Sequence, residues 1–306
     1  MRIVFLGTPD FAVESLKALA TTKHEIVAVV SQPDRKTVRG VSSMTPVKSV
    51  ALELGLKVLQ YEKIRVEGVE ELKELKPDLM VTCAYGQIIS QEILDIAPKG
   101  VINVHASLLP KFRGSSPIQW AILTGEKKTG ITIMKTALEV DSGDILIQKE
   151  VEIKDKENAG QLFDRLSLLG AQTLLEAIDL IDKGEDVYTP QDSTKATHYP
   201  MLKKEDGHID WSKSMQEIKC LIYGMTPWPS AFSYLNGKLF KIFDIDTVED
   251  NSQMQIGEIL IKDKTMYVKC KDGLIRLNEV QIENKKRMPS SEFIKGYQLK
   301  QGDKLN

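Results

Sequence analysis

The sequence predicts an α/β fold with a mostly parallel sheet, followed by a small β-barrel. Three observations lead to this expectation. Apolar runs alternate with helical patterns over residues 1–188, which is typical of a parallel sheet covered by helices on both faces. Residues 189–207 are polar and lack a clean period, so we expect a linker there. Short β-rich runs with turn signals then fill residues 208–306, which is typical of a barrel.

Short apolar runs predict the strands of the first domain. The last two of these runs are joined by about eight residues, which is too short for a helical crossover. We therefore expect these two strands to add an antiparallel edge to the sheet. The expected strands are 2–7, 25–30, 57–60, 78–84, 100–106, 129–135 and 144–151.

Capping residues and helical spacing predict the helices between these strands. Thr45 is a good N-cap and Pro46 suits the first helical position, while Gly55 ends the same helix. Ser90 can cap the next one. The expected helices are 9–19, 46–55, 90–96, 117–125 and 158–183, with another at 213–224 before the barrel strands.

The barrel is predicted from short runs at regular spacing. Asn236-Gly237 and Asp272-Gly273 are hairpin turn signals between some of these runs. The runs read SAFSYL, KLFKIFDI, QIGEILI, TMYVKC and LIRLNEV.

Charge and composition exclude several classes of protein. The chain has 306 residues and a formal net charge of -2, so nucleic-acid binding would need local basic patches. Cys83, Cys220 and Cys270 are far apart, which argues against disulfides and zinc. No apolar run approaches the roughly 20 residues of a membrane span, and the N-terminus reads as a strand rather than a signal peptide. We expect a cytoplasmic protein without a bound metal.

The turn after the first strand does not suit a dinucleotide. A G-x-G-x-x-G turn lets the backbone approach a pyrophosphate, whereas this chain reads GTPDF at 7–11. Pro9 has no N–H to donate. A nicotinamide-dependent dehydrogenase is therefore disfavoured, and this turn either opens a helix or makes a weak contact with substrate or cofactor.

Polar side chains interrupt the apolar strand 100–106. Asn103 and His105 are two residues apart, so in a strand they point to the same face. The segment 138–146, LEVDSGDIL, adds Asp141 and Asp144. An asparagine N–H can stabilise an oxyanion, and a carboxylate can hold an imidazole in one tautomer. This set suits acyl transfer to an amine that the substrate supplies. The alternatives are a structural Asn–His pair and an Asp144 that only caps its turn.

Basic residues gather in two segments. The long connection 31–44, SQPDRKTVRGVSSM, carries Arg35, Lys36 and Arg39, and is either a solvated loop or an arm that holds a phosphate-rich partner. Near the C-terminus, Lys285, Lys286 and Arg287 are either solvated or part of a nucleic-acid patch of the barrel. That patch would also include Lys238, Lys241, Lys269 and Lys271.

The segment 102–119, INVHASLLPKFRGSSPIQ, with D-S-G-D at 141–144, closely resembles the signature of the 10-formyltetrahydrofolate-dependent formyltransferases. Further resembling motifs follow in order, from GTPDFAVESL near the N-terminus to TPWPSAF before the barrel, so the resemblance covers nearly the whole chain. It implies a Rossmann-like formyltransferase domain and an OB-like barrel. It also implies that Asn103, His105 and Asp141 are the catalytic set.

The resemblance implies the formyl donor as well. 10-Formyltetrahydrofolate is the expected co-substrate, and no metal is required. Arg113 has no role assigned by the resemblance. The implied folate contacts are Ser107, Leu108, Leu109 and Pro110, the pterin-pocket residues Tyr85, Gly86, Gln87 and Ile88, and Asp144.

The SQPDR segment and the loop after it resemble those of family members that formylate methionyl-tRNA. This loop reads VRGVSSM where such members usually read GRGKKL. The resemblance implies initiator methionyl-tRNA as the acceptor and a monomeric enzyme. Two other hypotheses are a formyltransferase for nucleotide-linked amino sugars and a catalytically silent RNA-binding protein. The implied tRNA contacts are Arg35, Lys36, Arg39, Lys285, Lys286 and Arg287.

Overall fold

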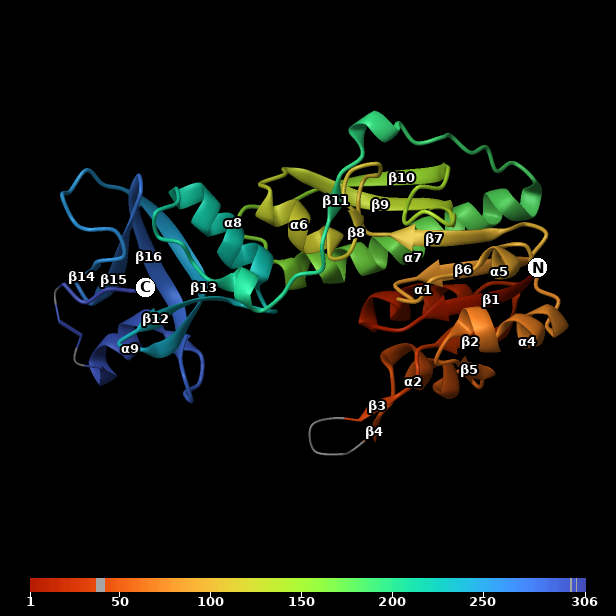
Figure 1. Cartoon of the computed structure of the whole chain (residues 1–306), viewed down its shortest axis with the longest axis horizontal. Helices are drawn as coiled ribbons and strands as arrows, with labels where there is room; N and C mark the ends of the chain where they lie inside the picture. Colours follow the sequence, from red (N-terminus) through yellow and green to blue (C-terminus); the bar gives the residue numbers. More distant parts are fainter. Residues whose placement is uncertain (37–41, 298, 301) are drawn as a thin grey trace. The chain divides into compact units, whose positions relative to one another are not determined.

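The computed structural model describes residues 1–36, 42–297, 299–300 and 302–306 (Figure 1). Contacts within the chain divide it into two compact units. The expected division into 1–188, 189–207 and 208–306 stays a prediction, but residues 189–199 lie in the first unit. The first unit contains Met1–Pro117, Thr129–Val151 and Phe163–Tyr199, and the second contains Ile118–Lys128, Glu152–Leu162 and Pro200–Asn306.

The first unit is built on a mostly parallel sheet, as the sequence predicts. Its strands follow the order β10-β9-β7-β6-β1-β2-β5. β1 pairs in parallel with β2 and β6, and β6 pairs in parallel with β7. β9 runs antiparallel to β7, which confirms the predicted antiparallel edge. The strands are β1 (Arg2–Gly7), β2 (Glu25–Ser31), β5 (Val58–Gln60), β6 (Leu79–Cys83), β7 (Val101–His105), β9 (Lys128–Lys135) and β10 (Ile145–Glu152).

The helices of this region follow the predicted spacing with local differences. Thr45 caps α2 through its side chain, which accepts a hydrogen bond from Lys48 N. Ser90 does not cap α5 through its side chain, and α5 is only four residues long. A short 3-10 turn precedes α1, and α3 and α4 were not predicted. The helices are η1 (Asp10–Ala12), α1 (Val13–Ala20), α2 (Pro46–Glu53), α3 (Ile64–Glu67), α4 (Val69–Glu74), α5 (Gln91–Leu94), α6 (Pro117–Leu123) and α7 (Ala159–Lys183).

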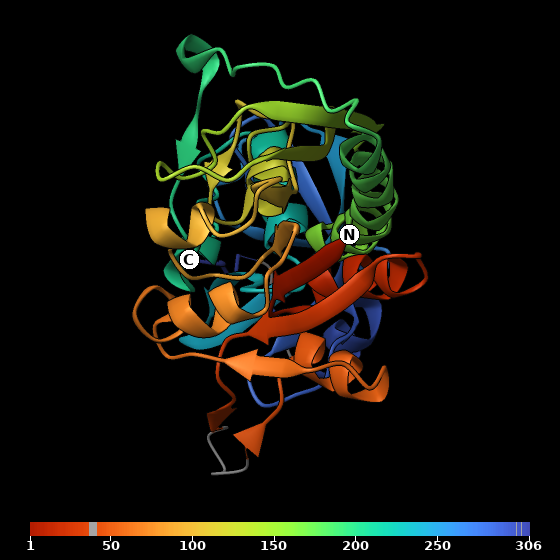
Figure 2. The same cartoon turned by 90° about the vertical axis from the view of Figure 1, so that its right-hand side faces the viewer.

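Helices cover both faces of the sheet. On one face, Ile64 of α3, Leu72 of α4 and Ile93 of α5 join one buried cluster with strand residues of the sheet. On the other face, α7 approaches β7, where a Cβ added to Gly170 would lie 3.2 Å from Val104. Figure 2 shows α7, in green, beside the strands. Because side chains alternate along β7, Asn103 and His105 share the face of Val101 rather than that of α7.

The second unit contains a small antiparallel barrel. Its strands follow the order β12-β13-β16-β15-β14, and β17 pairs with β16. The C-terminal residues join the two ends of this sheet, because Leu305 bridges to Leu235 and Lys304 bridges to Glu258. The elements are α8 (Met215–Met225), β12 (Ala231–Leu235), β13 (Lys238–Glu249), β14 (Ile259–Lys262), β15 (Thr265–Cys270), β16 (Gly273–Ile282), β17 (Met288–Pro289) and α9 (Ser290–Gly296).

The predicted Asn236-Gly237 turn joins β12 to β13. Both residues have positive φ, 50° and 77°, as a type I′ hairpin turn requires. Leu235 and Lys238 are paired directly across it. In the part of the chain that the structure describes, no helix is long and apolar enough to cross a membrane.

Candidate active site

The Asn103 side chain is oriented by the neighbouring strand. Thr82 of β6 lies opposite Asn103 of β7 in the parallel pair. The Thr82 hydroxyl donates a hydrogen bond to Asn103 Oδ1 at 2.9 Å. Among the described residues, Asn103 Nδ2 has no hydrogen-bond partner. The amide group therefore keeps its two N–H donors available for a ligand oxygen.

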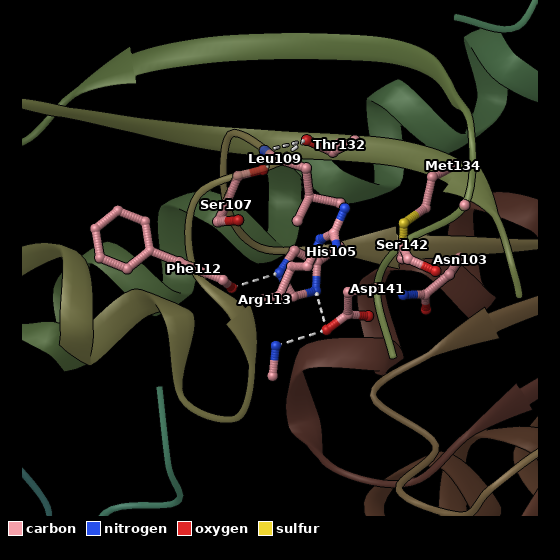
Figure 3. A network of polar contacts seen from close by, with 12 residues as sticks. Asn103, His105, Ser107, Leu109, Phe112, Arg113, Thr132, Met134, Asp141 and Ser142 are labelled. Carbon is pink, nitrogen blue, oxygen red and sulfur yellow. Dashed lines mark hydrogen bonds and ion pairs between the residues drawn. The ribbon is translucent and has the colours of Figure 1, made fainter. Parts of the chain in front are cut away.

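His105 uses its two ring nitrogens differently. Its side chain is buried, and Nε2 lies 3.0 Å from the backbone oxygen of Phe112 (Figure 3). A carbonyl oxygen can only accept, so Nε2 carries the proton of this hydrogen bond. Nδ1 faces the Asp141 carboxylate, with 3.6 Å between Nδ1 and Oδ2. The free nitrogen of the ring is thus turned toward an anion.

A tight loop brings Asp141 to His105. Asp141 has φ +52°, a left-handed conformation that costs a non-glycine residue about 1–2 kcal/mol. Its Oδ2 accepts a hydrogen bond from Gly114 N at 2.8 Å. A Cβ at Gly143 would lie 1.9 Å from the backbone oxygen of Lys135, so only glycine fits there. The D-S-G-D motif is therefore required for the turn as well as for its carboxylate.

Residues of the expected linker support the same loop. Gln191 Nε2 donates to the backbone oxygens of Asp141, at 2.8 Å, and Gly143, at 2.7 Å. Gln191 Oε1 accepts from Arg113 Nε and Nη2, at 3.1 and 2.8 Å. Arg113 also belongs to the two-residue strand β8 (Arg113–Gly114), which pairs in parallel with β11 (His198–Tyr199). Sequence reasoning did not find Gln191, because nothing in a polar, aperiodic stretch indicates a contact with residues about fifty positions earlier.

The loop after β7 is held by side chains from the edge strands. Leu109-Pro110 is a cis peptide bond. The Thr132 hydroxyl donates to Ser107 O at 2.7 Å and accepts from Leu109 N. Gln148 Nε2 donates to Leu109 O at 2.8 Å. Ser107 is buried and donates its own hydroxyl to Lys111 O, so its side chain shapes the loop from within. Leu109 is buried too, whereas Leu108 and Pro110 are partly exposed.

The segment predicted to line the pterin pocket is tied to the ends of β1 and β2. The Tyr85 backbone oxygen accepts hydrogen bonds from the Thr8 hydroxyl at 3.0 Å and from Gln32 Nε2 at 2.9 Å. Gln87 binds backbone atoms of two earlier residues through its side chain. Ile88 is 66% exposed. The GTPDF and SQPDR motifs therefore fix the backbone at Tyr85-Gly86, where Gly86 has φ +81°.

A cavity of 660 Å³ is lined by residues that follow this segment in the sequence, from Gln91 onward, and residues 85–88 are not part of its lining. It lies along the amino-terminal end of β7 and includes Val101, two residues before Asn103. Thr136 Oγ1 is buried and has no hydrogen-bond partner among the described residues. Asp144 lies outside this lining, and its backbone oxygen accepts from Lys135 N at 2.9 Å. The cavity is lined by Gln91, Leu94, Asp95, Ala97, Pro98, Lys99, Gly100, Val101, Lys135, Thr136, Ala137 and Leu138.

An ion pair anchors the start of the first basic segment. Lys48 Nζ lies 2.6 Å from Asp34 Oδ2, and hydrogen bonds from Lys48 and Gln60 lower the pKa of the Asp34 carboxyl. Arg35 is exposed and donates to a neighbouring side chain. Lys36 pairs with Ser42 between the two-residue strands β3 (Arg35–Lys36) and β4 (Ser42–Ser43). Arg39 lies outside the described residues.

The second basic segment is exposed, and the side chain of its third residue has partners within the barrel. Lys285 and Lys286 are exposed after β16. Arg287 is held by Glu279 and lies over the Phe243 ring, 4.2 Å from its centroid.

The sequence also suggested a larger basic patch on the barrel, and the prediction that Lys269 belongs to it is wrong. Lys269 is 7% exposed, and its Nζ lies 2.9 Å from Asp250 Oδ2. Its neighbours in β15, Val268 and Cys270, are buried as well. Lys238 and Lys271 are exposed and Lys241 is partly exposed.

The described residues offer little to a metal or a covalent mechanism. They contain no group of three or more His, Cys, Asp or Glu side chains that could hold a metal ion. The three cysteines are free and buried. Burial raises the pKa of the Cys83 thiol to about 12, so this group stays protonated and unreactive.

Family models and relatives match over nearly the whole chain. The formyl transferase model matches residues 1–178, and the model of the formyl transferase C-terminal domain matches residues 201–298. A methionyl-tRNA formyltransferase of Ruminiclostridium cellulolyticum is 44% identical over 310 residues, covering 100% of this chain and 99% of that protein. The one of Citrifermentans bemidjiense is 45% identical and covers 100% and 96%.

Solved structures show the same fold at lower identity. The N-formyltransferase of Helicobacter canadensis, in complex with folinic acid and dTDP-3-aminofucose, is 19% identical. It has a TM-score of 0.69 and covers 92% of this chain and 100% of that chain. HypX of Aquifex aeolicus in complex with tetrahydrofolic acid is 20% identical, with a TM-score of 0.63, and covers 96% and 47%.

Proposed function

The chain belongs to the formyl transferase family, and we propose that it transfers the formyl group of 10-formyltetrahydrofolate to the α-amino group of initiator methionyl-tRNA. The product, formylmethionyl-tRNA, serves translation initiation. Relatives that are 42–45% identical over almost their full length carry the name methionyl-tRNA formyltransferase. The observation that supports the chemistry is the approach of Asp141 to His105 on the face of β7 that also carries Asn103.

The reaction needs a stabilised oxyanion and a place for a proton. The amine attacks the formyl carbon, and the formyl oxygen of the tetrahedral intermediate becomes negative. Asn103 Nδ2 donates a hydrogen bond to this oxygen, since its N–H groups are otherwise unpaired. The proton that leaves the amine is taken up between His105 Nδ1 and Asp141 Oδ2, which are 3.6 Å apart. The positive charge of the protonated imidazole then also stabilises the nearby oxyanion electrostatically.

The intermediate collapses without a covalent enzyme species. The bond between the formyl carbon and folate N10 breaks, and N10 receives the proton held by the His105–Asp141 pair. The acceptor nitrogen keeps the formyl group. No protein nucleophile is used, which agrees with the burial of the three thiols.

The cavity beside β7 is our proposed site for the pterin ring. Its volume of 660 Å³ lies in the usual range for small-molecule sites. Leu94 and Val101 supply apolar surface, and the unpaired Thr136 hydroxyl can bind a polar edge of the ring. The reacting N10 would then lie toward Asn103. In this proposal Asp144 and residues 107–110 flank the rest of the folate, and residues 85–88 border the pocket.

Local basic segments are proposed to hold the tRNA, because the net charge of -2 provides no general attraction. The proposed phosphate contacts are Arg35, Lys36 and Arg39 in the first unit and Lys285, Lys286 and Arg287 in the second. We further propose a monomeric enzyme in the cytoplasm, where its substrates are made, with a catalytic domain of residues 1–188, a linker of residues 189–207 and a tRNA-binding barrel of residues 208–306.

The acceptor is tested by offering two substrates separately. Labelled 10-formyltetrahydrofolate is mixed with the protein and either charged initiator methionyl-tRNA or a nucleotide-linked amino sugar. Label in the tRNA-borne methionine, lost in an Asn103→Ala/His105→Ala double variant, is the expected result. Label in the sugar alone would overturn the acceptor, and label in neither acceptor would overturn the proposed activity.

A further inference from the structure

We propose that Gln191, oriented by Arg113, is a positioning residue that holds the Asp141 carboxylate opposite His105. This inference rests on the proposed formyl transfer. Gln191 uses all of its strong hydrogen-bonding capacity on this task. Its two N–H groups bind the carbonyls of Asp141 and Gly143, and its oxygen binds two N–H groups of Arg113. Gln191 itself reaches no reacting atom, so its effect must pass through Asp141.

The loop that carries Asp141 has other polar attachments, the hydrogen bond from Gly114 N to the Asp141 carboxylate and a 3.5 Å ion pair between Glu139 and Arg113, and neither holds the Asp141–Gly143 backbone. Leu138 and Val140, just before it, are 62% and 59% exposed, so apolar packing does not fix this stretch. The positive φ of Asp141 is unfavourable and must be maintained by contacts. Ser142 binds back to Glu139 within the loop, which tightens the turn without attaching it to the rest of the unit. Gln191 attaches the Asp141–Gly143 backbone to β8 through Arg113.

Arg113 determines which way the Gln191 amide points. Its guanidinium has donors and no acceptor, so it selects the amide oxygen and leaves the NH2 group for the two carbonyls. Arg113 is 4% exposed, and a buried guanidinium keeps its orientation. Hydrogen bonds from a charged donor are about twice as strong as neutral ones. The buried charge that had no role in the sequence interpretation therefore orients the side chain that holds the catalytic loop.

Small displacements of Asp141 should slow the reaction strongly. A misplacement of about 1 Å in a catalytic constellation can cost roughly 10²-fold in rate. Gln191→Met keeps the length of the side chain but removes its N–H donors. We expect kcat to fall by roughly 10–100-fold, while KM for folate and for tRNA stays within about twofold. Gln191→Glu should do the same, because it keeps the bonds to Arg113 but places a carboxylate oxygen against the two carbonyls.

A double-mutant cycle separates positioning from general stability. The four proteins are wild type, Gln191→Met, Asp141→Asn and the double variant, with Asp192→Ala as a matched control. Asp192 is the exposed neighbour of Gln191 and caps only the next turn. In the Asp141→Asn background, Gln191→Met should cost almost nothing further, and Asp192→Ala should leave kcat unchanged. Equal, additive losses in both backgrounds would overturn the proposal, as would a kcat loss in Asp192→Ala as large as that of Gln191→Met.

A spectroscopic readout does not depend on the acceptor. The imidazole ¹⁵N signals of His105 are compared in wild type, Gln191→Met, Gln191→Glu and Asp141→Asn. Both Gln191 variants should shift the Nδ1 signal in the direction that Asp141→Asn shifts it, and the Nε2 signal should remain. If the wild-type protein transfers no formyl group, the proposed function is refuted. The ¹⁵N shifts still decide the role of Gln191 in that case. An unchanged Nδ1 signal in either folded Gln191 variant would overturn that role.

Discussion

Nδ1 of His105 lies 3.6 Å from Oδ2 of Asp141, slightly too far for a direct hydrogen bond. The other ring nitrogen is bound to a backbone oxygen at 3.0 Å, which fixes the plane of the ring. One nitrogen therefore holds the imidazole in place, and the other shares a gap with a carboxylate. A gap of this size between a base and an anion suits a proton that arrives with the substrate and leaves with the product.

Asn103→Asp tests the oxyanion contact. The substitution keeps the shape of the side chain but replaces its NH2 donor with a charged oxygen that repels the intermediate. We expect kcat to fall by about 10²–10³-fold or more, with little change in folate binding. Single-turnover transfer and equilibrium binding of folate measure the two effects. Weaker folate binding at an unchanged rate would contradict the assignment of Asn103 to the intermediate.

Thr82→Val tests how the amide of Asn103 is held. Valine has the shape of threonine but cannot donate the 2.9 Å hydrogen bond to Asn103 Oδ1. The net free-energy contribution of such a hydrogen bond is about 0.5–1.5 kcal/mol, so kcat should fall roughly 2–10-fold. Thr82→Ser keeps the hydroxyl and should retain the wild-type rate. Equal rates in the Val and Ser variants would show that the amide needs no such support.

The proposed tRNA contacts predict a change in salt dependence. Each phosphate contact contributes about 0.7–0.9 to the slope of log affinity against log salt. The Lys285→Gln/Lys286→Gln variant should therefore lose roughly 1.4–1.8 of this slope. Lys17→Gln/Lys183→Gln, which removes two exposed lysines of the first unit, serves as the control. An identical slope in both double variants would argue against the proposed contact.

The Asp34–Lys48 pair predicts a pH-dependent part of stability. Hydrogen bonds from Lys48 and Gln60 hold the pKa of Asp34 below its ordinary value in the folded state. Such a group stabilises the fold above its unfolded pKa, about 3.9, and loses this contribution as pH falls through the lower folded pKa. Wild type should exceed Lys48→Met in unfolding free energy at pH 7, and the difference should shrink below about pH 4. Urea unfolding at both pH values measures this, and a difference that grows toward acid would contradict the sign.

Local patterns predicted most of the fold. Alternating apolar runs gave the parallel sheet, and a connection too short for a crossover gave its antiparallel edge. α3 and α4 were missed because they are only four and six residues long, in a stretch rich in charged residues. Ser90 was expected to cap a longer helix, but its hydroxyl is buried and unpaired among the described residues. A sequence shows that a serine can cap, but tertiary packing decides whether it does.

The candidate site was predictable only in part. The i, i+2 spacing of Asn103 and His105 placed both on one face, because strand geometry is local. Gln191 was invisible, since a side chain that binds a distant backbone leaves no period or motif. The prediction that Lys269 is exposed failed for the same reason, because its partner Asp250 is distant in the sequence. In the proposed mechanism, the positions found from sequence carry the chemistry, and Gln191, which sequence reasoning missed, holds one of them in place.

Single-turnover formyl transfer by Asp141→Asn is the most direct test of the central claim, that the His105–Asp141 pair handles the amine proton. Wild type and variant are mixed with labelled 10-formyltetrahydrofolate and charged initiator methionyl-tRNA at saturating concentrations. We predict that the variant binds both substrates as tightly as wild type and transfers the formyl group at least about 10²-fold more slowly. Transfer at the wild-type rate would contradict the account.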